Sequence, residues 1–135
     1  MKTLYEKGQG QKKGKVTDRI KTFEDACKEL GIDKIQMELI GLDSGDSESV
    51  ESYIKLIIIA KALNEGWMPD WSDSNQYKYF PWFEHKSGFG LSYDGCDYWH
   101  ASTSVGSRLC FKSSELAEYA GKQFGDIYNN YLSIK

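Results

Sequence analysis

The chain of 135 residues has few of the features that would place it in a specialised class. Its longest apolar run, Leu56 to Ala60, is far shorter than the roughly eighteen apolar residues that a transmembrane helix needs. The lysine-rich N-terminus has no apolar block behind it, so it does not have the form of a secretory signal. We therefore expect a cytoplasmic protein that does not engage a membrane.

Cysteine is scarce as well. Three cysteines at wide spacings form an odd number, which argues against a disulfide framework and fits a reducing compartment. They are Cys27, Cys96 and Cys110. Cys96 and His100 give a C-x3-H spacing, but on one strand these two residues would lie roughly 13 Å apart, too far to bind one ion. We expect no zinc at these residues.

The same residues raise an enzymatic alternative. Cys96 or Cys110 would be the nucleophile of a small hydrolase, with His85 or His100 as the base and Asp97 orienting the imidazole. No local sequence signature supports this arrangement. The balance of the sequence is against an enzyme.

Other chemical motifs are missing. Neither G-x-x-x-x-G-K-[ST], G-x-G-x-x-G nor G-x-S-x-G occurs. An EF-hand loop counted from Asp70 would have Asn75 in place of its glycine and Pro81 in place of its glutamate. The segment from Ser104 to Arg108 has the small residues of an anion-binding turn, although a plain turn is the simpler interpretation. The sequence predicts no cofactor.

Positive charge is concentrated at one end of the chain. The first 21 residues carry seven basic and two acidic side chains, a net charge of +5, whereas the remaining residues carry ten basic and eighteen acidic ones, a net charge of −8. Residues 1–15 hold three glycines and five lysines with little apolar surface, which is typical of a flexible segment. We expect a flexible basic arm, 1–15, attached to a single domain, 16–135.

Two helices are expected in the N-terminal half. The first begins after the capping residue Thr22, has an apolar face and ends at Gly31. The second is capped by Asp46 or Ser47 and closes at Gly66. Its apolar face is wide, which predicts a central helix covered on more than one side. That face comprises Val50, Tyr53, Ile54, Leu56, Ile57, Ile58, Ile59 and Leu63.

Strands are expected after a loop from Trp67 to Gln76. Residues 77–85 alternate as a strand with aromatic side chains on both faces, and Pro81 places that strand at a sheet edge because proline donates no ladder hydrogen bond. Turns are predicted at Ser87-Gly88 and at Asp94-Gly95, with a strand between them. Residues 96–103 and 108–112 are predicted to add a third and a fourth strand.

A closing helix begins after Ser113, with an apolar stripe that runs to Tyr131. Gly121 and Gly125 lie inside it, and two helix glycines predict close approach to another backbone. The expected fold is therefore α+β, with two N-terminal helices, an antiparallel meander of three to four strands, and a closing C-terminal helix.

The candidate binding site lies in the stretch from Trp67 to Trp99, which holds all four tryptophans and 11 of the 19 aromatic residues. A single-layer sheet packed on helices buries only one of its faces. The prediction is that either Tyr77, Tyr79 and Phe83 or Phe80 and Trp82 stay exposed, beside basic side chains. The candidate binding residues are Trp67, Trp71, Tyr77, Lys78, Tyr79, Phe80, Trp82 and Lys86.

Two segments, PDWSDSNQYKYFPWF (69–83) and GSRLCFKSSELAEYAGKQF (106–124), resemble those of small uncharacterised proteins recurrent in gut-bacterial genomes, prophages and mobile elements. The resemblance covers roughly the last seventy residues. It implies a phage-related accessory protein, and it assigns no residue a role.

Three functions are compatible with these patterns. The favoured one is a non-enzymatic binding module that recognises a protein partner, or a second copy of itself, through an aromatic face. An alternative is single-stranded nucleic-acid binding, in which bases stack on the aromatic side chains and the basic arm meets phosphates. The other alternative is the cysteine- and histidine-based hydrolase. The acidic domain disfavours a polyanionic partner.

Overall fold

The computed structural model describes residues 14–33, 41–86 and 90–134. Within them the fold is α+β, with five α-helices, one short 3-10 helix and one antiparallel sheet of two strands. The predicted basic arm lies outside the described residues except for Gly14 and Lys15, as does the predicted Ser87-Gly88 turn. In chain order the elements are α2 (Val16–Arg19), α3 (Phe23–Leu30), α4 (Ser44–Asn64), β1 (Lys78–Lys86), β2 (Gly90–Trp99), η1 (Ser107–Leu109), α5 (Ser114–Gln123) and α6 (Gly125–Leu132).

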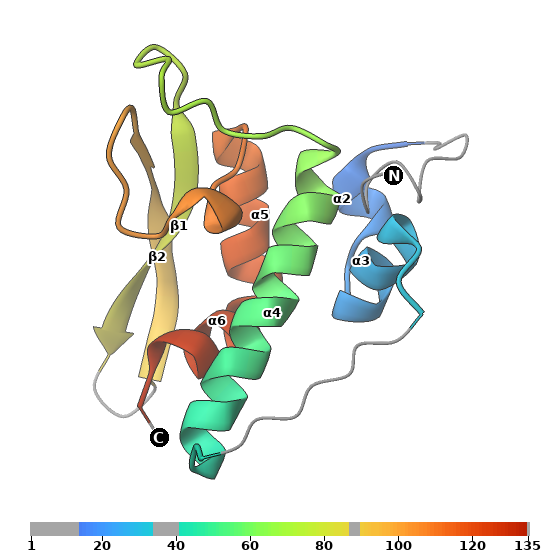
Figure 1. Cartoon of the computed structure of the whole chain (residues 1–135), viewed down its shortest axis with the longest axis vertical. Coiled ribbons are helices and arrows are strands. Elements are labelled where there is room, and N and C mark those ends of the chain that lie inside the picture. The colour runs from blue at the N-terminus through green and yellow to red at the C-terminus, as the bar shows by residue number, and fades with distance from the viewer. Residues whose placement is uncertain (1–13, 34–40, 87–89, 135) are drawn as a thin grey trace.

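The long helix α4 is central, as its wide apolar face predicted. It packs against α3 on one side and α6 on the other, and it also touches α2, α5 and η1 (Figure 1). Its start differs from the prediction, because Asp43 caps it by accepting a hydrogen bond from the Asp46 amide at 2.9 Å. At its other end Glu65 adopts the left-handed conformation, with φ 49°, one residue before Gly66.

The first predicted helix is confirmed as α3. The Thr22 hydroxyl accepts from the Asp25 amide at 3.1 Å, and the Asp25 carboxylate accepts from the Thr22 amide at the same distance. This reciprocal pair satisfies two amide groups that the first turn leaves without helical partners. Gly31 ends the helix with φ 70°, a conformation that costs glycine little.

The two strands form one long hairpin, and the predicted Asp94-Gly95 turn is wrong. Trp82 pairs with Gly95 and Phe83 pairs with Tyr93, so Asp94 is an extra residue that bulges out of β2. The strand continues through the bulge to Trp99. The residues predicted to begin a third strand are therefore the second half of β2.

The predicted fourth strand is replaced by a crossing segment. After β2 the chain passes in front of β1 and enters η1, between β1 and α4 (Figure 1). Phe111 then makes a single two-bond bridge with Tyr79, at 3.0 and 2.7 Å. Because Pro81 lies two residues from Tyr79, its nitrogen points toward the same outer edge of β1, where the absent N–H group interrupts no pairing.

The closing helix begins where predicted, since the Ser113 hydroxyl caps it by accepting from the Leu116 amide. It divides at Phe124, whose φ of −112° and ψ of 25° are not helical, so the expected single helix is two, α5 and α6. Both helices lie between the hairpin and α4, with α5 against both strands.

The core fills the space enclosed by α3, α4, α5, α6 and the segment 109–111. Its fully buried side chains include Ile20, Leu30, Leu56, Ile59, Leu63 and Phe111. Phe83 and Tyr79 pack against this core from β1. No helix within the described residues has the length and apolar character needed to cross a bilayer.

Gly121 marks the closest approach of α5 to the hairpin, and it provides the first test. A Cβ atom at this position would collide with the Tyr93 ring and lie 2.8 Å from Pro81 Cβ. Gly121→Ala should therefore lower the free energy of unfolding by about 1–3 kcal/mol in urea denaturation, although alanine is the better helix former.

Gly125 is the matched control, because a Cβ there would meet no atom within 4 Å. Gly125→Ala should leave stability unchanged or raise it by up to about 1 kcal/mol. Equal effects of the two substitutions would contradict the close packing of α5 on Tyr93 and Pro81.

Candidate aromatic binding surface

The predicted binding residues divide between exposed and buried positions. Tyr77 and Trp82 are 43% and 54% exposed, whereas Phe80 is 2% exposed and Lys78 has no exposed surface. Neither of the two predicted sets is therefore left outside as a group. Trp67, Trp71 and Tyr79 are half-buried, and Lys86 ends β1 with a side chain that lies outside the described part of the chain.

Lys78 is not available to a phosphate group, which corrects its predicted role. Its ammonium group donates to the carbonyl oxygen of Asp73 at 2.8 Å and to that of His100 at 2.7 Å. The same nitrogen lies 5.2 Å from the centre of the Trp71 ring. These contacts hold the loop before β1 and the segment after β2 against the outer face of the hairpin.

The loops held against the outer face also bury Phe80. It stacks on Trp99 with ring centres 5.9 Å apart. Trp71 belongs to the cover as well, because its indole nitrogen donates to the Ser107 hydroxyl at 2.5 Å and ties the loop before β1 to η1. On this face the loops act as a second layer, which a sheet of two strands otherwise lacks.

The opposite face carries the most continuous exposed aromatic surface of the described residues. We call it the tyrosine cluster: Tyr77, Tyr79, Tyr98 and His100. Tyr77 and Tyr98 stack with ring centres 4.5 Å apart and an angle of 8° between planes. Tyr79 meets both rings edge-on at 6.1 and 5.9 Å, and His100 does so at 4.7 and 5.5 Å.

The start of α5 lies against the hairpin next to this cluster. Pro81 packs against Gly121 of α5, and its partner Cys96 has its sulfur 3.9 Å from the carbonyl oxygen of Ser114, the first residue of that helix. The next pair of the hairpin on the same face is Tyr79 and Tyr98. The Tyr98 side chain is 44% exposed.

Sequence reasoning missed half of this cluster. Tyr98 and His100 were not among the candidate binding residues, and the predicted Asp94-Gly95 turn placed them in a separate strand. The register pairs Tyr79 directly with Tyr98, so the bulge brings the two halves together. The alternation of Cys96, Tyr98 and His100 was the signal that would have found them.

The charges around the hairpin are mainly acidic. Glu84, Asp94 and Asp97 are exposed on its strands, while the one lysine with a described side chain there, Lys78, is enclosed. Exposed carboxylates on the hairpin repel a polyanion but not a protein. The local charge therefore favours a protein partner over nucleic acid.

The surroundings of the three cysteines disfavour the thiolate form. Burial raises the pKa of the Cys110 thiol to about 11, and the thiol donates to the Gly106 carbonyl oxygen at 3.2 Å. Burial also raises the pKa of Cys96 and of Cys27, helped by nearby carboxylates. A catalytic thiol needs the opposite shift. No group of three or more metal-binding side chains gathers within the part of the chain that the structure describes.

Replacing Lys78 tests its structural role. Lys78→Met keeps most of the side-chain volume but leaves the Asp73 and His100 carbonyl oxygens without their donor. We expect the free energy of unfolding to fall by about 2–3 kcal/mol in urea denaturation. Lys28→Met, at an exposed position of α3, should change it by less than about 0.5 kcal/mol. A loss at Lys78 as small as that of the control would show that the two loops do not depend on the ammonium group.

Thiol labelling tests the positions of the cysteines. With a disulfide reagent at pH 8, Cys96 should react first, and Cys110 should react only after denaturation, because its pKa near 11 and its burial suppress the thiolate. Cys96→Ser should remove the fast phase. Because the folded-state pKa of Cys110 lies above its ordinary 9.0, its contribution to stability is complete below pH 9 and declines as the pH rises toward 11. Rapid labelling of Cys110 in the folded protein would contradict this placement.

Comparison of the chain with protein-family models, curated proteins and solved structures found no match. The resemblance of residues 69–83 and 106–124 to small proteins of gut bacteria and prophages therefore stays a prediction.

Proposed function

We propose that this protein is a non-enzymatic binding module that recognises a protein partner through the tyrosine cluster. The observation that carries the proposal is the exposed stack of Tyr77 on Tyr98, bordered edge-on by Tyr79 and His100. Tyrosine is enriched at interface hot spots because it combines a large apolar ring with a hydroxyl group.

The cluster is also well ordered for recognition. The rings belong to paired positions of a hairpin, and α5 fixes the hairpin through Gly121 and Pro81. Rings that already contact each other lose little conformational freedom when a partner covers them, so more of the contact energy remains for binding. A partner that lays its own apolar side chains across Tyr77 and Tyr98 would extend the stack.

The accessory role in a phage or mobile element, and the cytoplasmic location, are parts of the same proposal. They rest on the resemblance of residues 69–83 and 106–124 and on the odd number of widely spaced cysteines, which fits a reducing compartment. A second copy of this chain is one candidate partner. Sedimentation velocity of the purified protein, with and without changes in the cluster, separates self-association from recognition of a different protein.

The test of the proposal is the loss of partners on removal of two rings. Tyr77→Ser combined with Tyr98→Ser should reduce, by at least about tenfold, the amount of each protein that the wild type retains from its host lysate in quantitative capture. Leu42→Ser is the control, because Leu42 is 44% exposed and apolar but lies outside the cluster. Unchanged retention by the double variant, with wild-type melting behaviour, would show that the cluster is not the interface.

Single-stranded nucleic acid is the competing ligand, and a salt titration distinguishes it. We expect an oligonucleotide to bind weakly or not at all at low salt, because Lys78 is enclosed and the hairpin carries exposed carboxylates. Tight binding that weakens steeply with salt would contradict the proposal, above all if deletion of residues 1–15 flattened the slope.

A further inference from the structure

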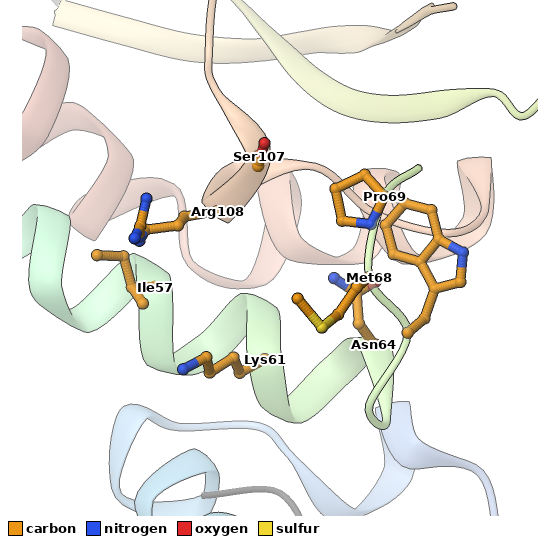
Figure 2. Close-up of a pocket in the computed structure, with 8 residues that line it drawn as sticks. Ile57, Lys61, Asn64, Met68, Pro69, Ser107 and Arg108 are labelled. Carbon is orange, nitrogen blue, oxygen red and sulfur yellow. The ribbon is translucent and has the colours of Figure 1, made fainter. Parts of the chain in front are cut away.

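A hollow of about 270 Å³ lies between α4, the loop that follows it and η1 (Figure 2). α4 contributes residues at positions i, i+4 and i+7, which share one helix face. The loop contributes three consecutive apolar residues, and η1 contributes two polar ones. The lining residues are Ile57, Lys61, Asn64, Trp67, Met68, Pro69, Ser107 and Arg108.

The walls of this hollow are fixed by side-chain hydrogen bonds. Asn64 is buried, and its amide group donates to the Cys110 carbonyl oxygen at 2.9 Å and accepts from the Lys112 amide at 3.1 Å. Ser107 is held from the other direction by the indole of Trp71. α4 and η1 are thereby clamped together, so the hollow exists before any ligand enters it.

The hollow carries two cationic side chains and no acidic one. Lys61 and Arg108 are both exposed, and neither makes an ion pair with a carboxylate within the described ranges. The other arginine of those ranges, Arg19, is paired with Glu29 and Glu65. In a domain with a net negative charge, two unpaired cations at one hollow form a local site for an anion.

The apolar half lies opposite. In Figure 2 the cationic ends of Lys61 and Arg108 lie at one end of the hollow, and Met68 and Pro69 lie at the other. Met68 is 80% exposed, and its unbranched side chain adapts to differently shaped apolar groups. The hollow therefore offers charge on one side and an apolar wall on the other.

We propose that this hollow binds a small molecule that carries an oxyanion, a carboxylate or a phosphate, on a compact apolar body. The guanidinium fork of Arg108 and the ammonium group of Lys61 contact the oxyanion, since arginine matches either group with two parallel hydrogen bonds. The apolar body lies against Met68 and Pro69. The volume is near the lower limit of pockets that hold small ligands, ~300–1,000 Å³, which favours a ligand smaller than a nucleotide.

The backbone of the preceding turn does not supply the anion site that its small residues suggested. The amide groups of Val105 and Gly106 both donate to the Thr103 hydroxyl, at 3.1 and 3.0 Å. Both amide groups therefore already have an acceptor within the turn. The side chain of Arg108, rather than these amides, provides the donors, and the site is separate from the tyrosine cluster.

The test uses three probes of similar size with the full chain: 3-phenylpropanoate, phenyl phosphate and the neutral 3-phenylpropanamide. In ¹H–¹⁵N spectra at pH 7, the anions should shift the indole signal of Trp67 and the backbone signals of Ser107 and Arg108. The amide should bind at least about fivefold more weakly than the matching carboxylate. Binding of one anion and not the other identifies which oxyanion the site takes.

Variants assign the effect to the two cations. Arg108→Gln and Lys61→Gln should each weaken anion binding about fivefold to tenfold, with unchanged melting temperature because both side chains are exposed and unpaired. Lys28→Gln, a substitution at an exposed position of α3, should leave anion binding unaltered. Binding of the amide as tightly as the tighter-binding anion, shifts confined to other regions, or no weakening in either variant would overturn the proposal.

Discussion

Lys78 holds two loops with one ammonium group, and the exposed surface of the hairpin depends on it. The carbonyl oxygens of Asp73 and His100 converge on its nitrogen, and Trp71 lies across it. This arrangement covers the outer face and buries Phe80. On this face Trp82 stays 54% exposed, while on the opposite face Tyr77 and Tyr98 are 43% and 44% exposed and stack on each other. Lys78 thus orders the loops at the end of the hairpin where the tyrosine cluster lies.

Asn64 plays a comparable part nearer the core. Its amide group joins the end of α4 to Cys110 and Lys112, on both sides of Phe111. Phe111 in turn bridges Tyr79 in β1. One buried side chain thereby connects the central helix to the edge of the hairpin, and it also forms a wall of the hollow beside η1. The cost of burying an amide is offset because both of its ends have partners.

The two proposed sites differ in the physics of recognition. The tyrosine cluster is an exposed, uncharged aromatic surface on a hairpin whose exposed charges are acidic, which suits a broad protein contact. The hollow near Arg108 is small and carries two unpaired cations, which suits a compact anion. Both are built on elements held by α4 and α5, so neither requires a large rearrangement of the described residues to bind.

Local chemistry determined the parts that the sequence could predict. Thr22, Gly31 and Ser113 mark helix ends because a cap depends on residues within one turn, and the crowding at Gly121 was anticipated because a helix glycine costs stability without a packing reason. The start of α4 was missed by only a few residues. Asp43, Asp46 and Ser47 all have side chains suited to capping, and Asp43 is the one that caps the helix.

Tertiary structure decided everything that depends on distant partners. Asp94-Gly95 has the composition of a turn, and only the pairing of Trp82 and Phe83 across the hairpin makes it a bulge. Lysine is usually a surface residue. Lys78 is buried only because its ammonium group donates hydrogen bonds to carbonyl oxygens 5 and 22 residues away along the chain. Alternation along a strand tells which side chains share a face. Whether that face is open or covered depends on loops that fold over it, and no local pattern carries that information.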